Sequence, residues 1–224
     1  MRDADVRRVL RRWLSAMYGG DANTLIVEEL GLCSGSVRAD MAVVNGSLKG
    51  YEIKSERDRL DRLFAQAEIY SRVFDTVTIV VADRHLKPTK SLVPAWWGID
   101  LVTPLGESDV IIQPLRKESA NPEVDPSALV QLLWRDEALG FLASRAIPLP
   151  RKKSRQNIWN CLVANLSLSE LRTGVRASLK SRTRWRAAGE QIPDGERSQL
   201  SATSSGSLCP LVLPRSRRYT YRPN

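Results

Sequence analysis

The sequence predicts an α/β protein, in which a core of interspersed helices and strands is followed by an all-helical C-terminal annex. Three observations support this. Hydrophobic spacing alternates between helical and strand-like over residues 1–116, a polar segment with two prolines follows at 117–126, and only helical spacing appears over 127–186. Residues 187–224 are rich in Gly, Pro, Ser and Arg without periodicity, so we expect a disordered tail there.

The N-terminal elements follow from spacing and turn residues. Apolar residues three and four apart predict a helix over 3–18, which ends at Gly19-Gly20. Period-two patterns then predict a β-meander. Helical spacing returns, and an apolar run after it is typical of a strand covered on both faces. These predictions cover residues 24–32, 37–44 and 48–54 as the meander, 58–73 as the helix and 76–82 as the covered strand.

The remaining elements are shorter. A loop containing Pro88 and Pro94 is expected to lead into two short strands, WWGIDLV and DVIIQ. Helical spacing then predicts three helices. Ser167 with Glu170 three residues later forms a capping-box pattern for the last one. The predicted helices span residues 127–144, 154–166 and 168–182.

Charge is unevenly distributed along the chain, whose net charge is +9. Residues 145–186 hold eleven Lys or Arg and a single acid, whereas residues 1–144 are slightly acidic. Arg172, Arg176 and Lys180 recur every four residues, so they form one basic stripe on the last helix. We expect this stripe to contact nucleic-acid phosphates, with a merely solvated helix face as the alternative.

Composition excludes several other classes. No apolar run reaches the ~18–20 residues of a membrane span, and the N-terminus lacks the apolar region of a signal peptide. The three cysteines (Cys33, Cys161 and Cys209) are far apart and form no CxxC pattern. We therefore expect a cytoplasmic protein without a membrane partner.

The meander carries the residues that point to chemistry. Asp40 is followed twelve residues later by Glu52-Ile53-Lys54, and Glu52 and Lys54 share one strand face. Two adjacent carboxylates would form a hard oxygen site for Mg²⁺ or Mn²⁺, and Lys54 could position a water or stabilise phosphate charge. The hypothesis requires a particular register of the hairpin. A two-residue turn at Asn45-Gly46 would place Asp40 opposite Tyr51, and Glu52 would then lie on the other face of the sheet from Asp40. We therefore predict a three-residue loop at 45–47 or a bulge near Gly50.

The pattern D-(x)11-E-x-K in this element order resembles the PD-(D/E)XK nuclease superfamily, with Ala39 in place of its proline. The resemblance implies a restriction-endonuclease-like core, which is a mixed sheet flanked by helices. In such a core Asp40, Glu52 and Ile53 would bind the metal and Lys54 would act in catalysis. Gln66 and Tyr70 resemble the Q-x-x-x-Y pair of the RecB-like branch, and would contact substrate or support the site.

Glu29 resembles the extra acid that many members supply, although Glu28 remains an alternative because periodicity does not distinguish adjacent residues. The longer string VEELGLCSGSVRAD is similar to small bacterial proteins of this superfamily.

These features lead to two hypotheses. The first is a Mg²⁺- or Mn²⁺-dependent nuclease that hydrolyses phosphodiester bonds; DNA is the expected substrate, although the sequence does not distinguish it from RNA. The second is a non-catalytic nucleic-acid-binding or scaffold protein that retains the fold. The sequence leaves the oligomeric state and the endo or exo mode open.

Overall fold

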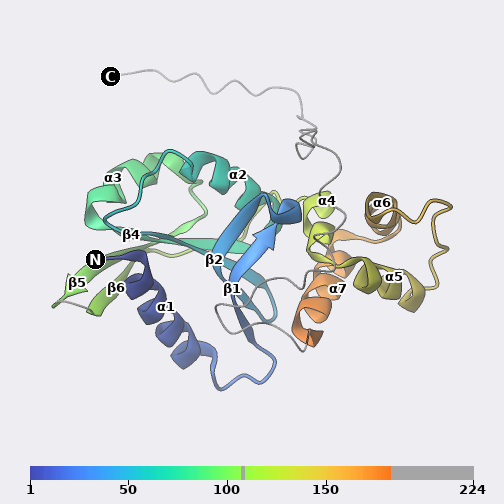
Figure 1. Ribbon diagram of the computed structural model, residues 1–224, viewed down its shortest axis with the longest axis horizontal. Helices are drawn as coiled ribbons and strands as arrows, with labels where there is room; N and C mark the ends of the chain where they lie inside the picture. The colour runs from blue at the N-terminus through green and yellow to red at the C-terminus, as the bar shows by residue number, and fades with distance from the viewer. Residues whose placement is uncertain (107–108, 183–224) are drawn as a thin grey trace, which may run out of the picture. The chain divides into compact units, whose positions relative to one another are not determined.

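A six-stranded mixed sheet lies at the centre of the fold in the computed structural model, which describes residues 1–106 and 109–182 (Figure 1). The strands lie side by side in chain order. The pairs β3–β4 and β4–β5 are parallel, and the other neighbours are antiparallel. The strands are β1 (Leu25–Leu32), β2 (Val37–Val44), β3 (Leu48–Lys54), β4 (Thr76–Ala82), β5 (Gly98–Leu105) and β6 (Asp109–Arg116).

Helices cover both faces of this sheet. Helix α1 (Asp3–Tyr18) lies on one face, and α2 (Leu63–Val73) and α3 (Asp83–Leu92) lie on the other (Figure 1). The predicted apolar stripe of α1 is buried at Val6, Leu10 and Leu14, where it joins a cluster with residues of β2 and β3 such as Met41 and Ile53. Burial of this stripe is the main reason why a helix with so many arginines is stable here.

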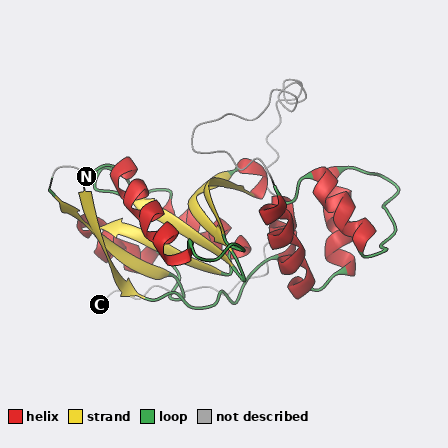
Figure 2. Ribbon diagram, turned by 90° about the horizontal axis from the view of Figure 1, so that it is seen from below, coloured by secondary structure: helices red, strands yellow, loops and turns green. Residues whose placement is uncertain are grey.

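The C-terminal helices form a group beside the sheet (Figure 2). A short 3₁₀ turn, η1 (Cys33–Gly35), lies between β1 and β2 and contacts this group. Asn121 ties the preceding segment to α2, because its buried side-chain amide donates to the carbonyls of Ser71 and Phe74. The group consists of α4 (Pro126–Leu129), η2 (Val130–Leu132), α5 (Arg135–Ser144), α6 (Arg155–Asn165) and α7 (Leu168–Ser181).

Three helical predictions were wrong in detail. The helix expected over 58–73 begins at Leu63. Pro88 lies inside α3, where a loop was expected. The helix packs against β4 and β5, and these tertiary contacts outweigh the hydrogen bond that proline cannot donate. The single helix expected over 127–144 is interrupted before Arg135, because the backbone N–H of Trp134 turns to the Glu137 carboxylate at 2.8 Å and begins a new helix.

The predicted hairpin register is confirmed. Val44 pairs with Leu48, so the loop holds three residues, 45–47, and no bulge is needed at Gly50. The loop is fixed by its own residues, since the Asn45 side chain accepts the backbone N–H of Ser47 at 3.0 Å. The capping box of the last helix is confirmed as well, with Ser167 accepting from the backbone of Glu170.

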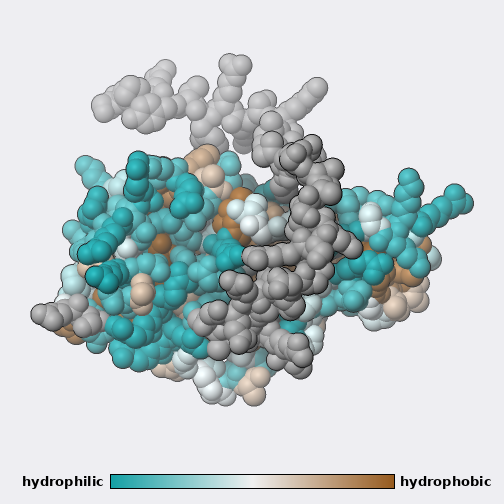
Figure 3. Space-filling view, in the orientation of Figure 1, coloured by the Kyte–Doolittle hydropathy of each residue, from teal (hydrophilic) through white to brown (hydrophobic). Residues whose placement is uncertain are grey.

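The α/β class, the mixed sheet flanked by helices and the C-terminal helices are thus as predicted. The tail expected at 187–224 and the end of the annex beyond residue 182 lie outside the described residues. None of the helices in the described part is long and apolar enough to cross a membrane. On the face shown in Figure 3 the surface is mostly hydrophilic, with apolar side chains in small patches.

Candidate functional site

The hairpin register brings Asp40 and Glu52 to the same face of the sheet. Met41 pairs with Tyr51, so the next position along the two strands places Asp40 opposite Glu52. The Asp40 carboxylate extends the ladder, because its Oδ2 accepts the backbone N–H of Ile53 at 2.7 Å. The carboxyl groups of Asp40 and Glu52, which were predicted to lie together, are therefore neighbours at the end of β3 that carries Lys54.

Glu52 lies at the centre of a buried polar network. Its side chain is 2 % exposed, and one carboxylate oxygen accepts from the Lys54 ammonium at 2.5 Å. The other oxygen accepts a short hydrogen bond from the Tyr70 hydroxyl. Lys54 Nζ also donates to Gln66 Oε1 at 3.1 Å. One turn of α2 thus supplies both Gln66 and Tyr70 to the E-x-K strand, as i, i+4 spacing allows.

Arg7 completes the site, and no sequence pattern distinguishes it from the other three arginines of α1. Its guanidinium donates to Asp40 Oδ1 at 2.7 Å and to the Asp40 carbonyl at 3.1 Å. The same group donates to Glu29 at 2.7 Å and to Asp3 at 3.2 Å. A cation on α1 is therefore held among three carboxylates from three different segments.

Burial and neighbouring charges both shift the pKa values of the residues at this site. The pKa of Asp40 is raised to about 7 by burial and by the neighbouring Glu52, although the Ile53 N–H and Arg7 both oppose the rise. Burial would lower the pKa of Arg7, but the charges of Asp40, Asp3 and Glu29 raise it above its ordinary value, so Arg7 stays protonated. Burial, followed by the charge of Glu52, raises the pKa of the Tyr70 hydroxyl.

The carboxylates fit a hard divalent cation in donor type. Asp40 and Glu52 repel each other, which a cation between them would relieve. Mg²⁺ commonly uses one or two carboxylates and completes its shell with waters and phosphate oxygens. Within residues 1–106 and 109–182, no cluster of three or more Asp, Glu, His or Cys side chains exists that could hold a metal alone. Ile53, expected as a further ligand, contributes its N–H to Asp40, so only its carbonyl oxygen could bind a metal.

The two candidate glutamates of β1 have different partners. Glu29 contacts Arg7 and reaches Asp40 only through that guanidinium, and its backbone has a φ of 55°, which is uncommon for a residue other than glycine. Glu28 pairs with Arg11 at 2.7 Å, outside the Asp40–Glu52 network. Glu29 is therefore the one of the two that belongs to the site.

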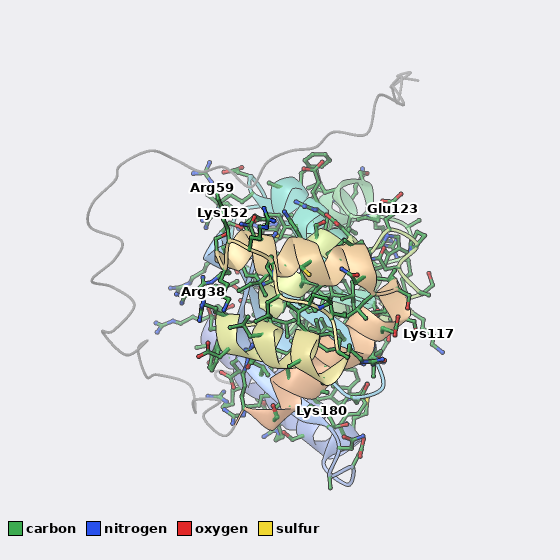
Figure 4. The ribbon with its side chains drawn as sticks, turned by 90° about the vertical axis from the view of Figure 1, so that its right-hand side faces the viewer. Arg38, Arg59, Lys117, Glu123, Lys152 and Lys180 are labelled. Carbon is green, nitrogen blue, oxygen red and sulfur yellow. The ribbon has the colours of Figure 1, made fainter. Side chains whose placement is uncertain are left out.

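The predicted basic stripe of α7 lies elsewhere. Arg172 and Arg176 pair with Asp75 at 2.9 and 3.6 Å, and Lys180 donates to Asn23 at 2.7 Å. Asp75 also accepts the backbone N–H of Leu48, at the opposite end of β3 from Lys54. These two ends are separated by the length of the strand, about 20 Å. Arg59 lies in the loop that follows Lys54, and in the view of Figure 4 Lys180 lies on the opposite side of the protein from it.

Comparison with known proteins identifies a family. Residues 4–191 match the family described as bacteriophage P4 protein cII. Protein cII of Enterobacteria phage P4 is 29% identical over 182 residues, which cover 81% of this chain and 68% of the phage protein. A solved structure of a protein of unknown function from Silicibacter pomeroyi is similar with a TM-score of 0.34 and 21% identity, over 55% of this chain and 80% of that one. A TM-score this low supports no conclusion about fold or function. The family match spans most of the sequence, and the chain therefore belongs to the bacteriophage P4 protein cII family.

Proposed function

We propose that this protein is a divalent-metal-dependent nuclease with a PD-(D/E)XK-like core, which hydrolyses phosphodiester bonds in DNA. The observation that carries the proposal is the convergence of Asp40, Glu52, Lys54, Gln66 and Tyr70 in one network. These residues come from β2, β3 and α2, and a register shifted by one residue would separate the two carboxylates.

Each residue has a chemical role in this proposal. Asp40 and Glu52, with the Ile53 carbonyl, would hold Mg²⁺ or Mn²⁺, which polarises the phosphodiester and lowers the pKa of a bound water. Lys54 has three donors, two of which reach Glu52 and Gln66. The third is available to orient the attacking water or to stabilise charge on the phosphate. In the balanced step the water oxygen bonds to phosphorus, the bond from phosphorus to the sugar oxygen breaks, and the proton lost by the water is taken up by that leaving oxygen, directly or through solvent.

The proposal is tested by incubating purified protein with plasmid DNA, single-stranded DNA and RNA in Mg²⁺ or Mn²⁺. We expect Lys54→Ala to reduce cleavage by roughly 100-fold or more, because a donor to the developing charge is lost. Asp40→Ala should abolish cleavage. Lys49→Ala is the matched control, since Lys49 lies on the same strand, near Glu118 at the other end. Circular dichroism checks that each variant is folded.

Two outcomes would contradict the proposal. Wild-type protein that cleaves none of these substrates with either metal is not a nuclease of this class. Cleavage that persists in both Asp40→Ala and Lys54→Ala comes from a contaminant.

A non-catalytic nucleic-acid-binding or scaffold protein is the second candidate. The observation that favours it is that both carboxylates already have partners within the protein, namely Arg7, the Ile53 N–H, Lys54 and Tyr70. A satisfied buried network of this kind also stabilises a fold without catalysis. Binding of DNA, measured by fluorescence anisotropy, without cleavage in the assay above would support this candidate.

A further inference from the structure

We propose that the arginine face of α1 binds the phosphate backbone of the nucleic acid and leads it to Asp40. This inference rests on the proposed function for the identity of the ligand. Four arginines lie on neighbouring turns of this helix. Arg7 and Arg11 form one row with i, i+4 spacing, Arg8 and Arg12 form the adjacent row, and both rows face the same side. They line an open groove of about 500 Å³, together with Asp3, Ala4, Ser15 and Glu28.

The groove ends at the candidate site. Arg7, one of its lining residues, is the residue that contacts Asp40 directly. A phosphate chain that follows the groove from Arg12 toward Arg7 would therefore arrive at the two carboxylates. The basic stripe of α7 has no such route, because Arg172 and Arg176 pair with Asp75 at the far end of β3.

The outer arginines are accessible to a ligand. The side chains of Arg8, Arg11 and Arg12 are 57, 55 and 69 % exposed. Arg8 and Arg12 form long ion pairs, with Asp5 at 3.7 Å and with Asp109 at 3.5 Å, and pairs of exposed guanidinium groups contribute little to stability. Arg11 is held more closely, at 2.7 Å, by Glu28. A guanidinium has five donors in a planar fork that matches phosphate, so these side chains suit a phosphodiester chain.

The burial of the apolar face of α1 makes an anionic membrane an unsuitable partner for this surface. A helix that binds at a lipid surface inserts its apolar face into the headgroup region. The apolar residues Val6, Leu10 and Leu14 are fully buried against the sheet. The arginines are thus presented by a rigid element whose apolar side is already in use, which favours a polyanion that needs only charge and hydrogen bonds.

The test compares two double variants of the full chain that each remove two charges. Arg8→Gln/Arg12→Gln changes the groove, and Lys152→Gln/Lys153→Gln changes exposed lysines in the basic segment before α6. Binding of labelled single- and double-stranded DNA is measured by fluorescence anisotropy in EDTA, over a salt titration. We expect the groove variant to bind roughly tenfold more weakly, with the slope of log affinity against log salt reduced by about two, and the lysine variant to bind like wild type.

A charge-retaining variant, Arg8→Lys/Arg12→Lys, separates lost phosphate contacts from lost structure, since it should keep most of the affinity and the salt slope. Thermal unfolding of all variants is measured alongside. A groove variant that is folded and binds like wild type overturns the inference. A loss of affinity that is confined to Lys152→Gln/Lys153→Gln also overturns the inference. Binding of anionic lipid vesicles in preference to DNA does so as well.

Cleavage in Mg²⁺ distinguishes this inference from the proposed function. If wild type cleaves DNA and the groove variant binds and cleaves equally well, the nuclease proposal stands and the groove inference fails. If wild type binds DNA through the groove without cleaving it, the inference stands and the nuclease proposal fails. Wild type that neither binds nor cleaves any nucleic acid contradicts both.

Discussion

Helices α1 and α7 have the same kind of sequence but use their basic residues differently. Each has an apolar stripe beside cations spaced four apart. On α7, Arg172 and Arg176 turn inward to Asp75 and fasten the helix to the sheet. On α1, Arg8 and Arg12 remain at the surface and only Arg7 turns inward, to Asp40.

The comparison shows that a count of charges along a sequence does not locate a binding surface. The segment 145–186 holds most of the excess positive charge, whereas 1–144 is slightly acidic. Arg172 nevertheless has its partner 97 positions earlier in the chain, at Asp75, and its charge is used inside the fold. The groove on α1 nevertheless lies in the segment that is slightly acidic on average. Whether an arginine is available to a ligand depends on the acids that lie close to it in space, and not on the average charge of its segment.

The largest effect is expected for Asp75→Ala, which removes the anchor of α7. The substitution leaves Arg172, Arg176 and the backbone N–H of Leu48 without their carboxylate. We expect the free energy of unfolding to fall by about 3 kcal/mol, as measured by urea denaturation, because charges that are largely buried lose their partner.

Asp75→Asn is the control, since it keeps an acceptor for the Leu48 N–H and should lose less. DNA affinity of the folded Asp75→Ala protein should be unchanged. A loss of DNA affinity without a loss of stability would mean that α7 binds the ligand and would reverse the comparison.

A pH-dependent effect is expected on the sheet face that α1 covers. Burial, together with the charge of Glu118, raises the pKa of Asp100 to about 6, above its usual value of 3.8. The folded chain therefore binds the proton more tightly than the unfolded chain, and stability is lost as the pH rises from about 4 through about 6. Asp100→Asn removes this loss, so its advantage in melting temperature over wild type should be larger at about pH 8 than at about pH 4.

A difference in melting temperature that stays constant with pH would contradict this expectation. The expected profile belongs to a carboxyl on the sheet face that α1 covers, whereas Asp75→Ala acts on the attachment of α7. The two variants therefore probe the packing of the two helices separately.

A smaller effect is expected for Ser167→Ala at the start of α7. Its side chain accepts the backbone N–H of Glu170 at 3.3 Å, and Glu170 accepts in return from the backbone of Ser167 at 3.0 Å. We expect a loss of about 1 kcal/mol by urea denaturation. Ser169→Ala, two residues later and exposed, should cost little. Equal losses for the two would show that the capping box does not fix α7.

The smallest effect on stability is expected for Arg12→Ala. Its ion pair with Asp109 spans 3.5 Å between largely exposed side chains, so its loss should change the unfolding free energy by less than about 0.5 kcal/mol. DNA affinity should still fall, and the salt slope should decrease by about one. Stability that falls without any change in DNA affinity would assign Arg12 a structural role and remove it from the groove.

Sequence reasoning was most successful where near neighbours decide the conformation. The bounds of α1, the three strands of the meander and the cap at Ser167 follow from periodicity and turn chemistry. The requirement that Asp40 and Glu52 share a face also predicted the loop at 45–47, which the register confirms. It was least successful at Pro88, where the packing of α3 against β4 and β5 outweighs the local preference of proline.

The sequence by itself therefore determined the α/β order of elements and the set of residues from β2, β3 and α2 that meet at one end of the sheet. Only the tertiary structure decided that Arg7 binds Asp40 and that Asp75 engages the arginines of α7. The physical reason is range. Helical and strand periods and turns are set by residues a few positions apart, whereas the partner of a charged side chain is set by how remote segments pack.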